Sequence, residues 1–251
     1  MKSLRFRLFL TLAALPLALA ACKQEAATPD GAAPKGDAVA AVAAPAGANW
    51  TETFAKTADG GYLIGNPNAP IKLVEYGALS CSHCADFSEA SSAELRSGFI
   101  ASGKVSYELR FFMLNALDIP ATLLATCGTT EAVLPLAEQF WAFQKTMFTN
   151  LQAAGEAGFQ QAGALPPAQR FGAIAKLGGM DTFFASRGIP AAQGAACLAD
   201  VNKATALADA TTKAGAEKNI TGTPTFFING TKLNENTWTG VKTALQAAGA
   251  R

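Results

Sequence analysis

The stretch Gly77–Phe87, GALSCSHCADF, contains two cysteines, Cys81 and Cys84, with two residues between them. It follows Ile71–Tyr76, a short and mostly apolar run of the kind that favours a β-strand. After it, apolar residues recur at roughly helical spacing, at Phe87, Ala90, Leu95 and Phe99. The sequence therefore predicts that the cysteine pair lies where a strand ends and a helix begins.

The position of the pair at the start of a helix favours redox chemistry. The first turn of a helix has free N–H groups and a partial positive charge, and both stabilise a thiolate. A stabilised thiolate is a reactive sulfur and a good leaving group. The alternatives are a structural disulfide, half of a zinc site or inert core cysteines. Zinc needs four ligands, however, and only His83 lies nearby in the sequence.

Residues 1–21 have the pattern of a secretory signal peptide. Met1–Arg7 is basic, and Leu8–Ala21 is an uncharged apolar run that is too short to span a bilayer comfortably. The run leads into Leu19-Ala20-Ala21-Cys22, which resembles a bacterial lipobox. The expectation is a lipidated Cys22 that anchors the protein to the inner or outer membrane, in the bacterial periplasm. An ordinary signal peptide with a free Cys22 is the alternative.

Residues 22–48 are predicted to form a flexible tether. They are mostly Ala, Pro, Gly and Lys with scattered acids, and their only larger apolar residues are two valines. Such a segment cannot bury enough apolar surface to fold on its own. We therefore expect the folded part to begin near residue 49.

From residue 49 the chain is organised as two halves of one α/β domain with helices between them. In residues 49–114, Val105–Met113 alternates apolar and polar residues, so the two strands and the helix between them predict a parallel βαβ unit. Residues 115–199 lack strand signals and predict an inserted helical block. In residues 200–251 a helix precedes the β run Thr225–Ile228, and Asn229-Gly230 then predicts a hairpin before a last helix.

These features together resemble the DsbA-type thiol–disulfide oxidoreductases, over roughly residues 60–251. The resemblance rests on Cys81-Ser82-His83-Cys84, on Thr223-Pro224 before the hairpin, and on Glu138–Phe143 in the helical block. It implies an α/β thioredoxin-like fold with an inserted α-helical domain. It also implies that the Cys81–Cys84 disulfide is the redox group, with no cofactor or metal. Reduced exported proteins would be the substrates, and a quinone-linked membrane protein of the DsbB type would be the redox partner.

Within the motif, each residue has an expected role. Cys81, nearer the helix tip, should be the exposed sulfur that forms a mixed disulfide with substrate, and Cys84 the buried one. His83 should stabilise the Cys81 thiolate and lower its pKa from the free value of about 8.5. Ser82 stands where these oxidases often have Pro, and its hydroxyl could hydrogen-bond a sulfur. That departure leaves the strength of the oxidant open.

The resemblance also assigns roles to Thr223, Pro224 and Glu75. Pro224 is expected to be cis, so that the backbone of Thr223 faces the sulfurs and can pair with an extended substrate. An ordinary trans proline is the alternative. Glu75 is a carboxyl in an otherwise apolar strand, which is costly unless its pKa rises or it finds partners. The resemblance places it beneath the sulfurs, to handle the proton of Cys84; a salt-bridged structural acid is the alternative.

The chain has five cysteines. Setting aside the lipidated Cys22 and the redox pair leaves Cys127 and Cys197, in or beside the helical block. An even remainder in an exported protein predicts a structural disulfide between them. A free Cys22 would instead leave one unpaired thiol beside an oxidant.

The sequence thus predicts a dithiol oxidase of the bacterial envelope, with other functions still open. The same site would serve a periplasmic reductase or isomerase, although isomerases of this fold usually carry an N-terminal dimerisation domain. A lipoprotein chaperone or binding module without turnover is an alternative from another class. A copper-handling protein is disfavoured because no further His or Met ligands lie near the pair. The net charge of +1 and scattered basic residues argue against nucleic acid as a partner.

Overall fold

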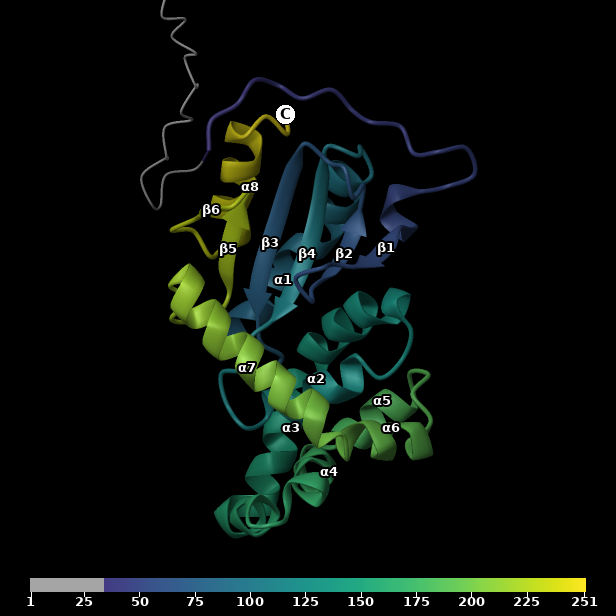
Figure 1. Cartoon of the computed structure of the whole chain (residues 1–251), viewed down its shortest axis with the longest axis vertical. Coiled ribbons are helices and arrows are strands. Elements are labelled where there is room, and N and C mark those ends of the chain that lie inside the picture. The colour runs from purple at the N-terminus through teal and green to yellow at the C-terminus, as the bar shows by residue number, and fades with distance from the viewer. Residues whose placement is uncertain (1–33) are drawn as a thin grey trace, which may run out of the picture.

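A six-stranded sheet in the order β1-β2-β4-β3-β5-β6 forms one end of the molecule (Figure 1). The computed structural model describes residues 34–251, so the predicted signal peptide and Cys22 lie outside the described residues. The strands are β1 (Phe54–Lys56), β2 (Tyr62–Gly65), β3 (Ile71–Gly77), β4 (Val105–Phe111), β5 (Thr225–Ile228) and β6 (Thr231–Lys232).

The central strands β3 and β4 are parallel, from the pair Ile71–Val105 to the pair Gly77–Phe111. They are joined by α1 (Ser82–Glu94) and the π-helical turn η2 (Leu95–Ile100), which confirms the predicted βαβ unit. The other strand pairs are antiparallel, including the predicted hairpin β5–β6. Because β3 has neighbours on both sides, the loop after it is positioned by the middle of the sheet.

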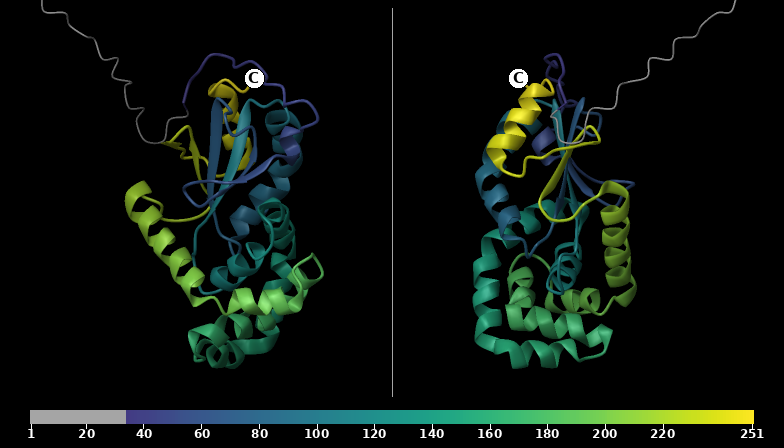
Figure 2. Two further views of the ribbon diagram at one scale, coloured as in Figure 1. Left: turned by 45° about the vertical axis from the view of Figure 1, so that its right-hand side comes forward. Right: turned by 90° about the vertical axis from the view of Figure 1, so that its left-hand side faces the viewer.

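Helices cover both faces of the sheet, as the side view in Figure 2 shows. On one face, α1 and α8 (Trp238–Ala247) pack through Phe87, whose ring lies 4.4 Å from that of Phe226 and 6.1 Å from that of Trp238. On the other face, α7 (Val201–Lys218) covers a smaller apolar cluster that includes Tyr76 and Phe227. These layers form the predicted α/β thioredoxin-like fold.

Five helices lie between β4 and α7 in the chain and form a separate block at the other end of the molecule (Figure 1). They are α2 (Asp118–Ala125), α3 (Thr130–Gly163), α4 (Pro167–Gly178), α5 (Met180–Ala185) and α6 (Ala191–Leu198). The long α3 bends at Gly155, where the φ angle is 70°. The block has an aromatic core in which the rings of Phe140, Phe143, Phe183 and Phe184 contact one another. Phe148, which also belongs to α3, lies outside this core and is 41% exposed.

The second half of the predicted tether, residues 34–48, is not free but lies along the domain. It passes over the end of the sheet opposite to the helical block (Figure 1). Its amides donate hydrogen bonds to the turn after η2 and to the end of α8: Val42 to Ser102, Gly36 to Ala247 and Val39 to Gly249.

The prediction failed here because it considered only the burial of large apolar side chains. This segment docks instead through its main chain and small residues. A Cβ at Gly249, where φ is 114°, would collide with the carbonyl oxygen of Asp37, so glycine permits the close approach. The carbonyl of Val42 also accepts a 2.7 Å hydrogen bond from Trp50 Nε1.

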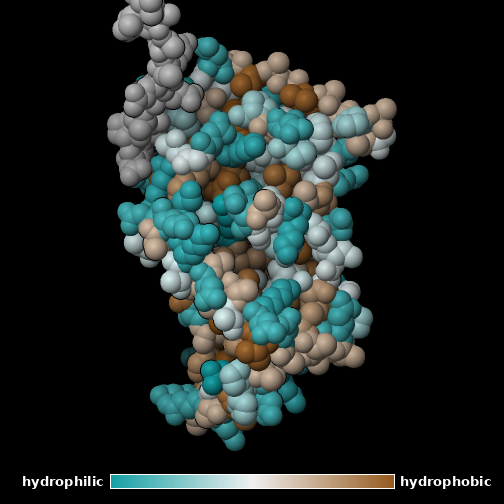
Figure 3. Space-filling model, viewed as in Figure 1, coloured by the Kyte–Doolittle hydropathy of each residue, from teal (hydrophilic) through white to brown (hydrophobic). Residues whose placement is uncertain are grey.

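The surface of the described part mixes polar and apolar residues, as the face in Figure 3 shows. Among the residues that the structure describes, three large hydrophobic ones are exposed: Val42, Leu114 and Phe148. Within residues 34–251, no helix combines the length and the apolar character needed to cross a bilayer.

Candidate active site

Cys81 caps the N-terminus of α1 with its own side chain. Its backbone is extended, with φ −81° and ψ 117°, and its Sγ accepts a hydrogen bond from the N–H of Cys84 over 3.2 Å. The same sulfur lies 3.3 Å from the carbonyl oxygen of Thr223, to which a thiol at Cys81 donates. The sulfur therefore sits at the positive end of the helix, as the sequence pattern predicted.

The two cysteines differ in their access to solvent, and both are largely covered. Cys81 is 7% exposed and Cys84 is fully buried, so Cys81 is the outer sulfur but a less exposed one than expected. The reason is the loop before β5, whose Thr223 lies against the Cys81 sulfur. Cys81 and Cys84 are not joined by a disulfide in this structure.

The local environment moves the pKa values of the two thiols in opposite directions. The hydrogen bond with the Cys84 side chain is the main cause that lowers the pKa of Cys81 to about 6, with further help from the N–H groups of Cys84 and His83. Burial opposes this shift. For Cys84, burial is the main cause that raises the pKa well above the ordinary value. At neutral pH, Cys81 is therefore the thiolate and Cys84 the thiol.

The side chains of His83 and Ser82 point away from the pair. The His83 imidazole is 76% exposed, with its Nδ1 3.8 Å from Oδ2 of Asp86, and it is the backbone N–H of His83 that acts on the Cys81 sulfur. Ser82 is exposed at the first position of α1. The sequence indicated that these residues flank the sulfurs, but the direction of each side chain depends on the helix.

The Thr223–Pro224 peptide bond is cis, as the resemblance implied. Pro224 is buried, while Thr223 is partly exposed next to Cys81. The main chain at Thr223 is thus the backbone that faces the outer sulfur. Thr225 follows as the first residue of β5, whose pairing with β3 brings this loop to the site.

Glu75 is fully buried in β3, and its Oε2 accepts a 2.8 Å hydrogen bond from the Tyr107 hydroxyl. Its Oε1 has no hydrogen-bond partner among the described residues. Burial raises the pKa of Glu75 to about 8; the Tyr107 hydrogen bond works in the opposite direction, and the charge on Cys81 adds to the rise. The Glu75 charge in turn raises the pKa of Cys84, so the two groups are electrostatically linked. This is not the salt-bridged acid that the sequence left as an alternative.

Beside Glu75 is a cavity of about 20 Å³. Polar groups line it on the side of α1, including Ser88 and Ser91, and the pair Arg96–Glu138, 2.8 Å apart, lies at its edge. A volume of this size holds about one water molecule. Apolar side chains, including Phe87 and Leu95, also line it, so the cavity beside the buried carboxyl is mixed in character.

Side chains of the inserted helices reach the loop between β3 and Cys81, a feature that the sequence reasoning missed. Trp141 Nε1 donates to the carbonyl of Ala78 over 3.0 Å, and Gln144 Nε2 donates to that of Leu79 over 2.9 Å. Asp118 binds the next residue in the loop. Only Trp141 lay in a stretch quoted for the resemblance, and neither Gln144 nor Asp118 has a sequence signal of its own.

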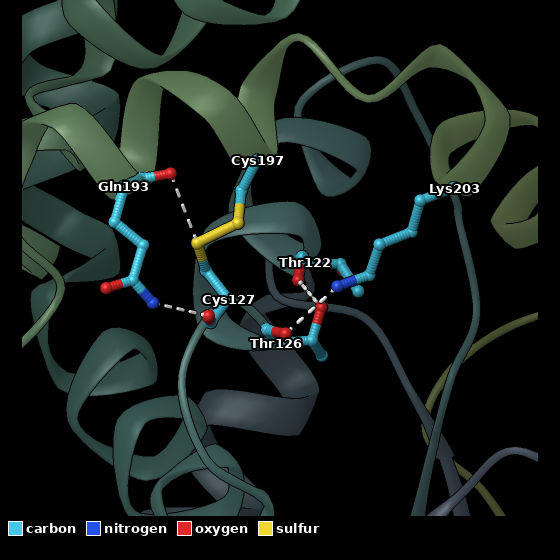
Figure 4. Close-up of a disulfide and its surroundings, with 6 residues drawn as sticks. All are labelled: Thr122, Thr126, Cys127, Gln193, Cys197 and Lys203. Atoms are coloured by element: carbon cyan, nitrogen blue, oxygen red, sulfur yellow. Dashed lines mark hydrogen bonds between the residues drawn. A yellow bond between two sulfur atoms is a disulfide. The ribbon is translucent and has the colours of Figure 1, made fainter.

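Cys127 and Cys197, the two cysteines predicted to pair, are joined by a disulfide with an S–S distance of 1.99 Å (Figure 4). The bond links the residues after α2 to α6, and so ties together two helices of the inserted block. Close by, Gln193 Nε2 donates to the Cys127 carbonyl over 2.7 Å, and Lys203 Nζ donates to the Thr126 carbonyl over 2.9 Å. This disulfide belongs to the helical block and not to the candidate active site.

Comparison with known proteins agrees with this geometry. A family model described as Thioredoxin matches residues 57–247. Among solved structures, a protein-disulfide isomerase from Novosphingobium aromaticivorans is 31% identical, with a TM-score of 0.72, over 76% of this chain and 98% of that one. Wolbachia pipientis alpha-DsbA1 is 19% identical, with a TM-score of 0.60, over 74% of this chain and 89% of that one, which is a likeness of fold.

A curated relative from Rickettsia prowazekii, provisionally named a protein-disulfide oxidoreductase, is 25% identical over 206 residues. The match covers 79% of this chain and 65% of the relative, so the chain spans less than two thirds of the length of that protein.

Proposed function

The chain belongs to the thioredoxin family, in the DsbA-like form that carries a helical insertion, and from this premise we propose that it is a thiol–disulfide oxidoreductase that oxidises dithiols in other proteins. The observation that carries the proposal is the contrast between the two sulfurs. Cys81 Sγ accepts a hydrogen bond from the N–H of Cys84 at a helix N-terminus, whereas Cys84 is buried behind it. A stabilised Cys81 thiolate favours the reduced protein and so makes the disulfide form oxidising.

In the first step, a substrate thiolate attacks Cys81 Sγ of the Cys81–Cys84 disulfide. The S–S bond breaks, a mixed disulfide forms between substrate and Cys81, and the electron pair goes to Cys84 Sγ. Because the Cys84 thiol has a raised pKa, the released sulfur takes up a proton. Glu75, with a pKa of about 8, is protonated at neutral pH and supplies it.

In the second step, another substrate thiolate attacks the substrate sulfur of the mixed disulfide. The bond to Cys81 breaks, the substrate leaves with a disulfide, and Cys81 departs as a thiolate. A pKa of about 6 makes it a good leaving group at neutral pH. The substrate has lost two electrons and the cysteine pair has gained them, so the reduced pair must be reoxidised by a partner.

An extended substrate segment would lie along the loop at Thr223. The backbone there faces the Cys81 sulfur, and main chain beside an active site can pair with an extended substrate as with an added strand. Backbone pairing depends little on side chains, so this mode of binding suits an enzyme that accepts many exported proteins.

We also propose that the protein works in the bacterial envelope, attached by a lipid on Cys22, and is reoxidised by a quinone-linked membrane protein of the DsbB type. The signal-like residues 1–21, the lipobox-like sequence before Cys22 and a second pair of cysteines suited to an oxidising compartment support this. Replacing Cys22 by Ala should release the protein from washed membranes. Retention of an unlipidated chain would contradict the anchor.

Isomerase activity is a second candidate, since the Novosphingobium aromaticivorans relative is named a protein-disulfide isomerase. An isomerase uses the reduced Cys81 thiolate to attack a wrong disulfide, so the two functions share the site and differ in redox state. The reduction potential of the Cys81–Cys84 pair, measured against glutathione, distinguishes an oxidase, an isomerase and a reductase from one another. An oxidase predicts a value near the −120 mV of a strong dithiol oxidant, and about −180 mV would favour isomerisation. A value near the −270 mV of thioredoxin would exclude the oxidase proposal.

A further inference from the structure

The carboxylate of Asp118 is fully buried and is surrounded by hydrogen-bond donors. Its Oδ1 accepts from the N–H of Ser80 over 2.8 Å. Its Oδ2 accepts from the Ser80 hydroxyl over 3.0 Å and from the N–H groups of Leu114 and Asn115 over 2.9 and 3.0 Å. Four donors converge on an acid that an apolar environment would otherwise exclude. These hydrogen bonds offset the cost of burying the carboxylate, and they connect the start of α2 to Ser80, Leu114 and Asn115.

Asp118 does not serve as an ordinary helix cap. It is the first residue of α2, the N-cap position is Leu117, and no side chain caps the helix there. Its carboxylate turns away from the amides of α2 and toward the loops that follow β3 and β4. It therefore fastens the beginning of the inserted block to the ends of the two central strands.

Ser80 is the residue directly before Cys81, and it is held from several directions. Besides its two bonds to Asp118, its hydroxyl accepts a 2.7 Å hydrogen bond from Asn115 Nδ2. The carbonyls of the two residues before it are held by Trp141 and Gln144. The backbone leading into Cys81 is thus fixed by side chains from the helical block.

We propose that Asp118 is a positioning residue of the exchange reaction, which holds Ser80 so that the Cys81 sulfur stays in line with the N–H of Cys84. The proposal rests on the proposed function, because it concerns the sulfur that exchanges. A Cys81 Sγ to Cys84 N distance of 3.2 Å depends on where the loop ends relative to α1. If Ser80 shifts, this hydrogen bond weakens and the thiolate loses stabilisation.

The sign of the effect separates positioning from a direct charge effect. If Asp118 acts through position, its loss loosens the loop and the pKa of Cys81 rises. If Asp118 acted as a nearby negative charge, its loss would lower the pKa of Cys81. If it only stabilised the fold, the unfolding temperature would fall and the pKa of Cys81 would stay the same.

The test compares Asp118→Asn with the unchanged full-length protein. Asparagine keeps the shape but offers one acceptor oxygen, so its NH₂ must face either the Ser80 N–H or the three donors at Oδ2. We expect the pKa of Cys81, followed by thiolate absorbance, to rise by at least half a unit. At pH 7 the equilibrium with glutathione should shift at least twofold toward the Cys81–Cys84 disulfide. An unchanged pKa and equilibrium, or a lower pKa, would overturn the proposal.

Ser80→Ala provides a milder second test, because it removes the hydroxyl and keeps the backbone N–H that binds Oδ1. It should raise the pKa of Cys81 and shift the glutathione equilibrium toward the disulfide, each by less than Asp118→Asn does. If Asp118→Asn does not fold, Ser80→Ala is the deciding test of the positioning role. No shift in that case would reject the positioning role.

Asn66→Ala is the matched control. Asn66 is 3% exposed and donates to the Gly103 carbonyl over 3.2 Å, near the turn that precedes β4. Its loss should lower stability without moving the pKa of Cys81. If the unchanged protein itself fails to equilibrate with glutathione, the proposed function fails. If it equilibrates and Asp118→Asn matches it, only the positioning role fails.

Discussion

The Tyr107 hydroxyl donates a 2.8 Å hydrogen bond to Glu75 Oε2, close enough to Cys84 for the Glu75 charge to raise the pKa of that thiol. The two residues lie on neighbouring parallel strands, β4 and β3, and both are buried. This pairing puts an acid with a pKa of about 8 next to the sulfur that must take up a proton.

Glu75→Gln should slow the attack of a model dithiol on the oxidised protein at pH 7 by at least tenfold. Glutamine fills the same space but cannot give a proton to Cys84, and general acid catalysis contributes roughly 10²–10⁴-fold in enzymes. The rate, expressed per substrate thiolate, should fall above about pH 8 in the unchanged protein and stay level in the variant. Tyr107→Phe should move that fall to higher pH, because the Tyr107 hydrogen bond lowers the pKa of Glu75. Equal profiles for all three proteins would remove Glu75 from the mechanism.

Glu75 should also make stability depend on pH in a defined window. Its pKa rises from an ordinary 4.5 to about 8 on folding, so the folded protein holds the proton more tightly. Stability is then greatest below pH 4.5 with respect to this group and is lost as the pH rises toward about 8. The difference in unfolding temperature between Glu75→Gln and the unchanged protein should therefore grow from pH 4.5 to pH 8 in favour of the variant. A difference that stays constant with pH would mean that burial does not shift this carboxyl.

Cys84→Ala should accumulate mixed disulfides through Cys81, whereas Cys81→Ala should accumulate none. In this variant the Cys81 thiolate attacks a disulfide of an envelope protein, one sulfur of which leaves as a thiolate, and without Cys84 the enzyme cannot break the mixed disulfide that results. Cys81 is the outer sulfur of the pair. Envelope proteins captured by each variant can be compared on non-reducing gels. Equal capture by both variants, or by neither, would contradict exchange through Cys81.

His83→Ala should raise the pKa of Cys81 by less than about half a unit. Since one pKa unit represents roughly 1.4 kcal/mol, the imidazole would stabilise the thiolate by less than about 0.7 kcal/mol. The imidazole is 76% exposed beside Asp86, and the backbone N–H that acts on the sulfur remains in the variant. Alkylation rates measured from pH 4 to pH 9 give the value directly, with an expected midpoint near 6 in the unchanged protein. A rise of more than one unit would show that the ring itself stabilises the thiolate.

Replacing Cys127 and Cys197 together by Ala should lower the free energy of unfolding by about 2–4 kcal/mol. The bond ties α2 to α6 within the block, away from the exchanging pair. Denaturant unfolding gives the stability, and the glutathione equilibrium of Cys81 and Cys84 serves as the control, since it should stay the same. Unchanged stability would mean that the helices hold together without the bond.

The strand, the cysteine pair and the following helix could be predicted because each has a dense local signal. Ile71–Tyr76 is a β-favouring run, and Cys81 and Cys84 are spaced as a redox motif. By contrast, β1 is three residues long and exists through its pairing with β2, so its own sequence gives little signal.

The contacts that fix the active-site loop could not be predicted because they join residues that are distant in the chain. Asp118 binds a residue 38 positions earlier, and Gln144 one 65 positions earlier. Without the fold, an Asp before an apolar helix is indistinguishable from a cap. The direction of the His83 side chain was equally out of reach, since a residue between two cysteines can face either the sulfurs or the solvent.

The docking of residues 34–48 determines the end of the domain from which the chain would lead to Cys22. The segment binds beside Ser102 and the end of α8, near the start of β4, while Cys81 follows the far end of β3. A strand of this length separates the two by roughly 20 Å. If Cys22 is held in a membrane, the anchored chain therefore joins the domain at the end opposite to the cysteine pair. A membrane partner that reoxidises the pair would then have to bind the end of the domain that lies farther from the point where the anchored chain joins it.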